Sequence, residues 1–364
     1  MIWNQRKEVN TLPAYKDEQR GTWYAQFYYK DWAGTRKKKL KRGFATKREA
    51  VAFERDFVNA HSGSVDMTFQ AFSVIYLEDM QHRLKLSTYE NKRFTIENSL
   101  IPFFGNMPLN VITPSDVRRW QNEMIAKGYS QTYLRGLHVQ LSSVFNYAVK
   151  YYSLAENPCK KAGSIGKQRA ESMQFWTLEE YKAFSKAVSH NIQAHTAFEI
   201  LYYTGMRIGE LLALTPSDVD LEACTISISK TYQRINGLDV ITPPKTAKSN
   251  RVIAIPQFLR DEIKDYIGKL YNISDNDRIF PVTKYAFNHM LKRYADKAGV
   301  KEIRLHDLRH SHASLLIEKG VNPLMIAQRL GHENIETTLN IYGHLYPTKE
   351  SELIACLEDL HCAP

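Results

Sequence analysis

The chain has 364 residues, of which 43% are hydrophobic and 24% charged, a composition typical of a soluble protein with two or three globular domains. No apolar run reaches the roughly 18 residues that a membrane-spanning helix needs, and the N-terminus lacks the apolar stretch of a secretion signal. A net charge of +10 favours a polyanionic partner such as DNA. A basic surface with no nucleic-acid partner is the alternative that charge alone leaves open.

The cysteines indicate a reducing compartment. Cys159, Cys224, Cys356 and Cys362 are few and show no C-x-x-C spacing. They predict free thiols, with neither a disulfide framework nor a zinc site. We therefore expect a cytoplasmic protein.

The positive charge is concentrated at the N-terminus, where residues 1–64 hold 14 lysines and arginines against 7 aspartates and glutamates. Residues 21–43 predict two strands around a turn at 31–34, the second of them strongly basic. Thr46 caps a helix whose Ala50, Phe53 and Phe57 can cover one face of this sheet. We expect the cations on the other face, where they could enter a major groove. A solvated edge strand protected from aggregation is the alternative. The candidate DNA-binding residues are Arg36, Lys37, Lys38, Lys39, Lys41 and Arg42.

A helical domain is predicted over residues 65–152. Apolar residues recur at helical spacing in four segments, the first beginning near Phe69 and the second near Ser87. Thr113 and Pro114 open the third helix as N-cap and first helical residue. The periodic residues are expected to form a core, and none of them is suited to catalysis. Residues 153–174, which contain Asn157-Pro158, two glycines and several cations, predict a flexible basic tether.

Residues 175–364 predict a mixed domain, mostly helical with one sheet. Segments 225–229 and 251–256 have the composition of partner strands. The stretch Gly205-Met206-Arg207-Ile208-Gly209 matches neither glycine pattern of the nucleotide-binding folds, so no nucleotide is expected.

Four short stretches of this domain carry residues suited to phosphate chemistry. Arg207 follows the helix-breaking Gly205, and Glu210 lies one turn on, where it can orient the guanidinium. Taken alone, such a pair is more often a surface ion pair. Lys245 lies between the two predicted strands, where the tip of a hairpin can hold a lysine toward a bound DNA strand. The other candidates are His306 and Arg309 in H-D-L-R-H, His332 in L-G-H, and Tyr342 ten residues beyond it.

This set of side chains suits the cleavage of a phosphodiester. Arginine forks bind phosphate oxygens and neutralise a pentacovalent transition state. A tyrosine supplies both the nucleophile and a leaving group similar in quality to the displaced alkoxide, while lysine and histidine transfer protons. No cluster of Asp and Glu suited to two-metal catalysis lies beside them, so the expected mechanism needs no metal.

A metal site is the alternative reading of His306, His310 and His312. A metalloprotease helix requires a glutamate directly after the first histidine, and Asp307 occupies that place. We therefore expect His310 and His312 to be structural or adjacent to DNA.

The motif T-G-M-R-I-G-E-L, Lys245 in a predicted hairpin, the motifs H-D-L-R-H and L-G-H, and then Tyr342 together resemble the tyrosine recombinases. They follow one another in that family's order, over residues 175–350. The resemblance implies a helical core-binding domain and a catalytic domain that together form a C-shaped clamp around DNA. The basic head, on residues 21–60, resembles the arm-binding domain of integrases from temperate phages and conjugative transposons.

The resemblance also implies roles for the residues that match its motifs. Tyr342 would be the nucleophile that forms a 3′-phosphotyrosyl link and frees a 5′-hydroxyl, and Arg207 and Arg309 would grip the scissile phosphate. The proton-transfer and hydrogen-bonding roles would fall to Lys245 as general acid, with Lys248 a less suitable substitute, to His306, which would assist the nucleophile, and to His332, which would hydrogen-bond the phosphate. Because the transesterification is isoenergetic, we expect no cofactor, neither ATP nor a metal ion.

We therefore expect a mainly α protein with small sheets (α+β), organised as an arm-type DNA-binding domain (1–64), a core-binding domain (65–152), a linker (153–174) and a catalytic domain (175–364). Its function would be site-specific integration and excision of a mobile element in a bacterial cytoplasm, through a Holliday junction. The expected partners are double-stranded DNA at core and arm-type sites, three further copies in a homotetramer, an excision factor and a DNA-bending host protein.

Other functions remain open. A chromosome-dimer resolvase of the same family would share the catalytic residues but generally lacks a basic head. A type IB topoisomerase would share the chemistry without choosing a site, and an inactive DNA-binding regulator would need neither the tyrosine nor the lysine. Residues 350–360 predict a short amphipathic helix that docks either on a neighbouring protomer or on its own domain.

Overall fold

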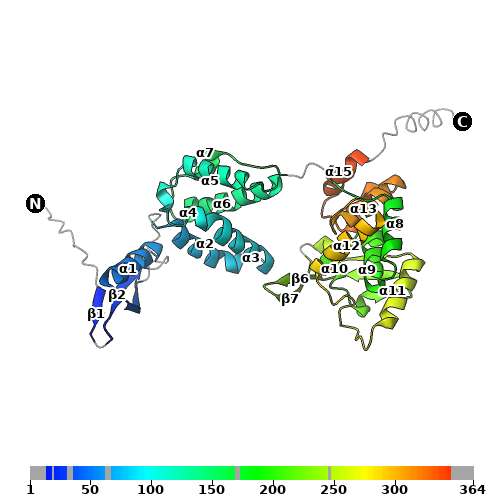
Figure 1. Cartoon of the computed structure of the whole chain (residues 1–364), viewed down its shortest axis with the longest axis horizontal. Coiled ribbons are helices and arrows are strands. Elements are labelled where there is room, and N and C mark those ends of the chain that lie inside the picture. Colours follow the sequence, from blue (N-terminus) through cyan, green and yellow to red (C-terminus); the bar gives the residue numbers. More distant parts are fainter. Residues whose placement is uncertain are drawn as a thin grey trace, which may run out of the picture. The chain divides into compact units, whose positions relative to one another are not determined.

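A computed structural model describes residues 14–18, 20–30, 36–61, 67–168, 173–244 and 247–345. The chain forms two compact units, Met1–Glu171 and Ser172–Pro364 (Figure 1). The described helices include none with the length and apolar character needed to cross a membrane. Cys159 and Cys224 are free thiols. The fold is mainly helical with small sheets, which confirms the α+β prediction.

The N-terminal part is an antiparallel sheet with one helix on it. Its elements, with strand order β1-β2-β3, are β1 (Ala14–Asp17), β2 (Thr22–Lys30), β3 (Arg36–Phe44) and α1 (Lys47–His61). Ala25 and Phe27 of β2 pack with Ala50 of α1 in a small core. The predicted cap is confirmed, since the Glu49 amide donates to Thr46 Oγ1 at 3.2 Å. Strand β1 was not predicted, because four largely exposed residues give no alternating pattern.

The helical part of the first unit contains, in chain order, α2 (Phe69–Arg83), α3 (Leu86–Thr95), the π-helical turn η1 (Ile96–Leu100), α4 (Ile101–Phe104), η2 (Leu109–Val111), α5 (Pro114–Ala126), α6 (Gln131–Tyr151) and α7 (Pro158–Ala162). The third helix begins as predicted: Thr113 accepts from the Asp116 amide, and the Asp116 carboxylate accepts from the Thr113 amide. Val117, Trp120 and Met124 of α5 are buried in one continuous core, as their spacing predicted.

The expected tether is partly folded, because α7 lies within it. Asn157 caps α7, with its Oδ1 accepting from the Cys159 amide at 2.9 Å, and the Cys159 side chain is buried. Further on, the Lys167 amide donates to the Gln131 carbonyl at 3.1 Å. The pair Asn157-Pro158 is typical of a turn, but it also suits a helix start, with an N-cap followed by proline at the first helical position. Packing on the helical part of the first unit therefore continues beyond residue 153, through α7 and Lys167.

The second unit is built around α9, whose side chains are buried on nearly every side. Its helices are α8 (Leu178–Val188), α9 (Ile192–Thr204), α10 (Ile208–Leu211), α11 (Gln257–Lys269), α12 (Lys284–Ala298), α13 (Asp307–Glu318), α14 (Pro323–Leu330) and α15 (Ile335–Tyr342), with short helical turns η3 (Pro216–Asp218), η4 (Ala247–Ser249) and η5 (Gly343–Leu345). The core around α9 therefore fixes the position at which this helix ends, at Thr204.

Two small sheets complete this unit. The first, of order β4-β5-β8, contains β4 (Val219–Asp220), β5 (Thr225–Ile228) and β8 (Arg251–Ala254), and it confirms the predicted pairing of the two strand segments. The second is a hairpin of β6 (Thr231–Ile235) and β7 (Leu238–Thr242). This hairpin was not predicted, and it turns at Asn236-Gly237, not near residue 245.

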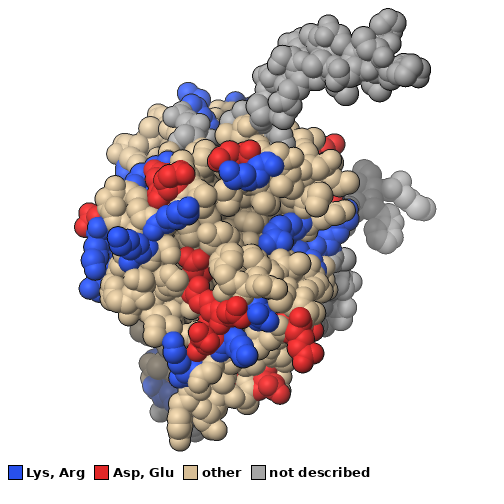
Figure 2. Space-filling view, turned by 90° about the vertical axis from the view of Figure 1, so that its right-hand side faces the viewer, with Lys and Arg blue, Asp and Glu red and all other residues tan. Residues whose placement is uncertain are grey.

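The exposed face that Figure 2 shows carries acidic and basic side chains intermixed, so it produces no extended positive field.

Candidate active site

Arg207 is positioned by the way α9 ends. Gly205 terminates the helix in the left-handed conformation (φ 66°), and a Cβ there would lie 2.6 Å from the His312 ring. The chain then turns, and Arg207 becomes the N-cap of α10. Its amide and its guanidinium donate to the two carboxylate oxygens of Glu210, each at 2.8 Å. The orientation of Arg207 by Glu210 is thus as the sequence predicted.

Glu210 is shared between two arginines. Its buried carboxylate also accepts from both terminal nitrogens of Arg251, at 2.9 and 3.2 Å, and Arg251 Nε donates to the carbonyl of Arg329. Burial alone would raise the pKa of Glu210, but the hydrogen bonds and charges of Arg251 and Arg207 outweigh it and hold that pKa below its usual range. Sequence reasoning missed Arg251, whose only signal was a cation at the start of a strand.

This shared ion pair predicts a large effect of Arg251 on stability. Arg251→Met leaves Glu210 buried with one partner, and breaking a buried pair in this way costs about 3–5 kcal/mol. We expect urea unfolding of the purified protein to show a loss of that order. The double variant Glu210→Gln/Arg251→Met removes the uncompensated charge and should recover at least about 1 kcal/mol. Equal losses in the single and double variants would show that Glu210 is not the reason.

Arg309 lies buried between the ends of two helices. It donates to the carbonyl of Gly205, the C-cap of α9, at 2.8 Å. It also donates to the carbonyl of Leu330, the last residue of α14, at 2.7 Å. It forms no ion pair with any carboxylate of the described ranges. Burial lowers its pKa to about 9, and the neighbouring charge of Arg207 acts in the same direction. Glu210 thus pairs with two of three neighbouring arginines, and Arg309 has no carboxylate partner among the described residues, which makes this cluster suited to bind an anion.

A pocket of about 380 Å³ opens beside this cluster. Arg207 and His332 line it, together with Glu210, Thr231, Gln233, Pro244, Ser249, Gly331, Glu333 and Thr337. The Nδ1 of His332 is hydrogen-bonded to Thr338 Oγ1 at 2.7 Å, which leaves Nε2 for a ligand. Burial and then the charge of Arg309 lower the pKa of His332 to about 4, so the ring is neutral at pH 7 and can donate one N–H to a phosphate oxygen.

Tyr342 is the last residue of α15 and is buried, with 1% of its surface exposed. Its hydroxyl lies 2.7 Å from Nδ1 of His310, and burial raises its pKa to about 12. His306, the N-cap of α13, is exposed, and its side chain forms no hydrogen bond to another described residue. The structure therefore joins Tyr342 to His310, a histidine to which the sequence assigned no role in the reaction.

The remaining predicted residues divide into two groups. Lys245 and the tail at 350–360 lie outside the described residues. Lys248 is described, and its ammonium donates to the Glu333 carbonyl at 2.7 Å, next to His332. His312 is buried and accepts from Arg329 Nε at 3.0 Å, as expected of a structural residue. Among the described residues, no group of three or more His, Cys, Asp and Glu side chains is arranged so that it could bind a metal ion.

The N-terminal sheet corrects the prediction that its cations all face away from the helix. Opposite residues of paired strands point to one face; Lys39 pairs with Phe27, and its ammonium lies over the Phe57 ring of α1. Lys41 lies likewise over Phe53. The face away from α1 instead carries Lys38, which lies opposite Tyr28, and Arg42, which lies opposite Tyr24. The side chains of Arg36 and Lys37 are not among those that the structure describes. Alternation along the strand, which the run of lysines obscured, places Lys39 and Lys41 on the helix side.

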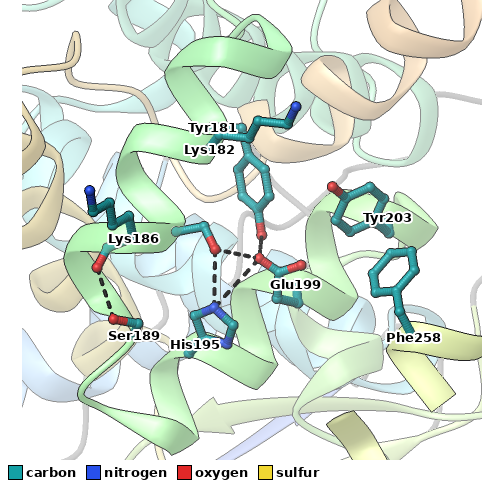
Figure 3. A pocket seen from close by; sticks show the side chains of 9 residues that line it. Tyr181, Lys182, Lys186, Ser189, His195, Glu199, Tyr203 and Phe258 are labelled. Carbon is teal, nitrogen blue, oxygen red and sulfur yellow. Dashed lines mark hydrogen bonds and ion pairs between the residues drawn. The ribbon is translucent and has the colours of Figure 1, made fainter. Parts of the chain in front are cut away.

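A second polar cluster lies between α8, α9 and α11 (Figure 3). Ser185 Oγ is 3.0 Å from His195 Nε2, and His195 Nδ1 is 2.6 Å from a carboxylate oxygen of Glu262. These distances resemble those of a Ser–His–Glu triad. Ser185 and Tyr181, however, both donate to Glu199, at 2.7 and 2.8 Å. A carboxylate on the hydroxyl opposes formation of an alkoxide, so the cluster is not a nucleophilic site and serves to join the three helices.

This cluster makes stability depend on pH. The hydrogen bond to Glu262 raises the pKa of His195. Its contribution is therefore fully present below the unfolded-state pKa of about 6.5 and is lost as the pH rises through the higher folded-state value. We expect His195→Gln to reduce the free energy of unfolding by about 1–2 kcal/mol at pH 6 and by less at pH 9. Urea titrations at both pH values, with exposed His289→Gln as control, would contradict this if the two losses were equal.

Comparisons with known proteins agree with this arrangement. Residues 174–349 match the phage integrase family, 68–125 the N-terminal SAM-like domain of phage integrases, and 13–60 an arm DNA-binding domain. The chain is 30% identical to the ICEBs1 integrase of Bacillus subtilis over 335 residues, which cover 87% of this chain and 91% of that protein.

Two solved structures share the fold. The integrase of the Tn1549 transposon, in complex with transposon right end DNA, matches 81% of this chain and 100% of its own with a TM-score of 0.66 and 23% identity. The lambda integrase tetramer bound to a Holliday junction matches 90% of this chain and 97% of its own, with a TM-score of 0.58 and 17% identity.

The site, the order of the domains and the similarity over nearly the whole chain lead to one classification. The arginine cluster with its pocket, and a tyrosine at the end of α15, occupy the range that matches the catalytic family. The arm-type sheet and the helical domain precede it in the order that integrases have. The chain belongs to the phage integrase family and is a tyrosine recombinase, a DNA-binding enzyme of the kind that mobile elements use for site-specific integration.

Proposed function

We propose that this enzyme integrates and excises its element by cutting each DNA strand with Tyr342, forming a 3′-phosphotyrosyl link, and by passing through a Holliday junction. The observation that carries the proposal is the buried charge of Arg309, which lies beside Arg207 and forms an ion pair with no carboxylate in the part of the chain that the structure describes. A scissile phosphate would supply the missing anion, and the guanidinium still has N–H donors beyond the two that hold it in place.

Two of the other predicted residues, His332 and Lys245, have a place in this reaction. His332, neutral and fixed by Thr338, would hydrogen-bond a non-bridging phosphate oxygen. Lys245 would protonate the departing 5′-oxygen. Lys248 is the less suitable donor because its ammonium already binds a backbone carbonyl. Neither ATP nor a metal ion is required, since one phosphoester bond replaces another of similar energy.

The three domains would divide the binding of DNA. We assign residues 1–64 to arm-type sites, 65–152 and 175–364 to the core site, and the intervening segment to the link between them. On the arm domain, Lys38 and Arg42 of the sheet face away from α1 are the first candidates for contact with DNA. Lys39 and Lys41 would contribute mainly long-range attraction, because their ammonium groups lie over rings of α1.

Assembly on DNA is proposed as a homotetramer in the cytoplasm of a bacterial host. The lambda integrase, which shares this fold, is seen as a tetramer on a Holliday junction. An excision factor and a DNA-bending host protein would set the direction of the reaction, as expected for an integrase with an arm domain.

The deciding experiment uses nicked suicide duplexes from the ends of the parent element. Wild-type protein should form a covalent protein–DNA adduct on denaturing gels, and Tyr342→Phe should form none. Peptide mapping of the adduct should place the nucleotide on Tyr342. Tight, specific binding by both proteins without an adduct from either would instead favour a DNA-binding regulator that lacks catalysis.

A further inference from the structure

Two histidines of the H-D-L-R-H motif lie near the reacting tyrosine, and they differ in what they touch. Nδ1 of His310 is 2.7 Å from the Tyr342 hydroxyl, and the two ring centroids are 5.6 Å apart. His306 is exposed at the start of α13, and its ring packs edge-on against His310 with centroids 5.1 Å apart. Only His310 is in hydrogen-bond contact with the oxygen that would attack phosphorus.

The surroundings of His310 favour one of its two neutral tautomers. Nε2 lies 4.0 Å from a carboxylate oxygen of the buried Asp307. Asp307 is itself held by Arg304, whose Nε and Nη2 donate to its two oxygens at 3.0 and 2.8 Å. A carboxylate on that side favours the N–H at Nε2, so the lone pair of Nδ1 faces Tyr342. The phenol is then the donor and the imidazole the acceptor.

Tyr342 needs a base. Burial raises the pKa of its phenol to about 12, so the hydroxyl stays protonated near pH 7. Burial also lowers the pKa of His310 below the usual histidine value, despite Asp307 acting in the opposite direction. The ring is therefore neutral and able to accept a proton at the pH at which the enzyme works.

On the basis of the proposed role of Tyr342 as nucleophile, we propose that His310 is the catalytic base of strand cleavage, in place of His306. As the Tyr342 oxygen bonds to phosphorus, its proton moves to Nδ1 of His310. The bond from phosphorus to the 5′-oxygen breaks, and that oxygen takes a proton from the general acid and leaves as a hydroxyl. In rejoining, the 5′-hydroxyl attacks phosphorus, its proton returns to the general acid, and the His310 imidazolium protonates the departing Tyr342. Asp307 acts as a positioning residue for the imidazole.

The test compares His310→Asn with His306→Asn in the full-length protein on nicked suicide duplexes, with single-turnover cleavage as the readout. Asparagine keeps a polar atom near the position of Nδ1 but accepts no proton. Each variant is made with tyrosine and with a fluorinated tyrosine at position 342, because the fluorinated phenol is more acidic and needs less help from a base. Binding of an intact core duplex, measured by gel shift, confirms that each variant is folded.

With tyrosine at 342, His310→Asn should slow cleavage by about 10²–10⁴-fold, the range of general base catalysis. Fluorination should recover at least about tenfold of that loss, but none of any loss caused by His306→Asn, as expected if only His310 acts on the phenol. Recovery in His306→Asn and not in His310→Asn would overturn the proposal, as would wild-type rates for His310→Asn.

Asp307→Asn provides an independent measurement, should His310→Asn fail to bind DNA. It removes the carboxylate that faces Nε2 while keeping the shape of the side chain, and its slower cleavage should also be relieved by the fluorinated tyrosine. A loss in Asp307→Asn that is unaffected by fluorination would contradict the proposed relay. Absence of an adduct from the wild-type enzyme would instead count against the proposed function itself, so the two failures are distinguishable.

Discussion

Arg309→Lys should reduce the rate of strand cleavage by about 10³-fold or more, although the positive charge is kept. Arg309 donates separately to the Gly205 and Leu330 carbonyls, and an ammonium on a flexible stem cannot meet both and a phosphate in the same geometry. One buried carbonyl would lose its partner, so we also expect a loss of about 1–3 kcal/mol in the free energy of unfolding. Single-turnover cleavage of a suicide duplex measures the first effect and urea unfolding the second.

A substrate with an uncharged scissile phosphate shows whether the slower cleavage by Arg309→Lys comes from lost neutralisation of the phosphate charge or from a change in the fold. A methylphosphonate at the cleavage position has no negative oxygen for Arg309 to neutralise, so the ratio of wild-type to variant rates should shrink on it. Arg293→Lys, an exposed change on α12, serves as the control and should leave both substrates unaffected. An undiminished ratio on the neutral substrate would mean that Arg309 does not act on phosphate charge.

Lys245→Ala should slow cleavage of ordinary DNA by about 10²–10⁴-fold, the contribution expected of a general acid. A substrate whose bridging 5′-oxygen is replaced by sulfur should restore most of this rate, because a thiolate leaves without a proton. The measurement is again single-turnover cleavage, with the oxygen and sulfur duplexes run in parallel.

Lys248→Ala is the matched control for this prediction. Lys248 lies three residues on, and its ammonium is bound to the Glu333 carbonyl. Its removal should cause a smaller loss that sulfur does not relieve. If the sulfur substrate rescued Lys248→Ala and not Lys245→Ala, the general-acid role would pass to Lys248.

The sequence allowed correct prediction of features that depend on neighbouring residues. Helix starts at Thr46 and Thr113 follow from side chains that cap amides three residues away. The orientation of Arg207 by Glu210 is likewise a contact across one turn. The pairing of β5 with β8 also followed from composition, because strand-forming residues alternate in the first segment and are frequent in the second.

Features that depend on distant contacts were missed. Arg251 meets Glu210 across 41 positions of the sequence, and His310 meets Tyr342 across 32. No local pattern distinguishes His310 from His306, since only the packing of α15 on α13 decides which ring reaches the tyrosine. In the N-terminal sheet, a run of cations obscured the alternation that turns Lys39 toward the helix.

The position of Arg309 also bears on how such an enzyme decays once selection on it is relaxed. The same guanidinium closes the ends of two helices and faces the site for phosphate, so activity and stability cannot be lost separately there. Tyr342→Phe, in contrast, removes one hydroxyl from a buried ring and keeps its packing. Among degraded relatives in old prophages, chains that still fold should therefore retain the arginine long after the nucleophile has gone.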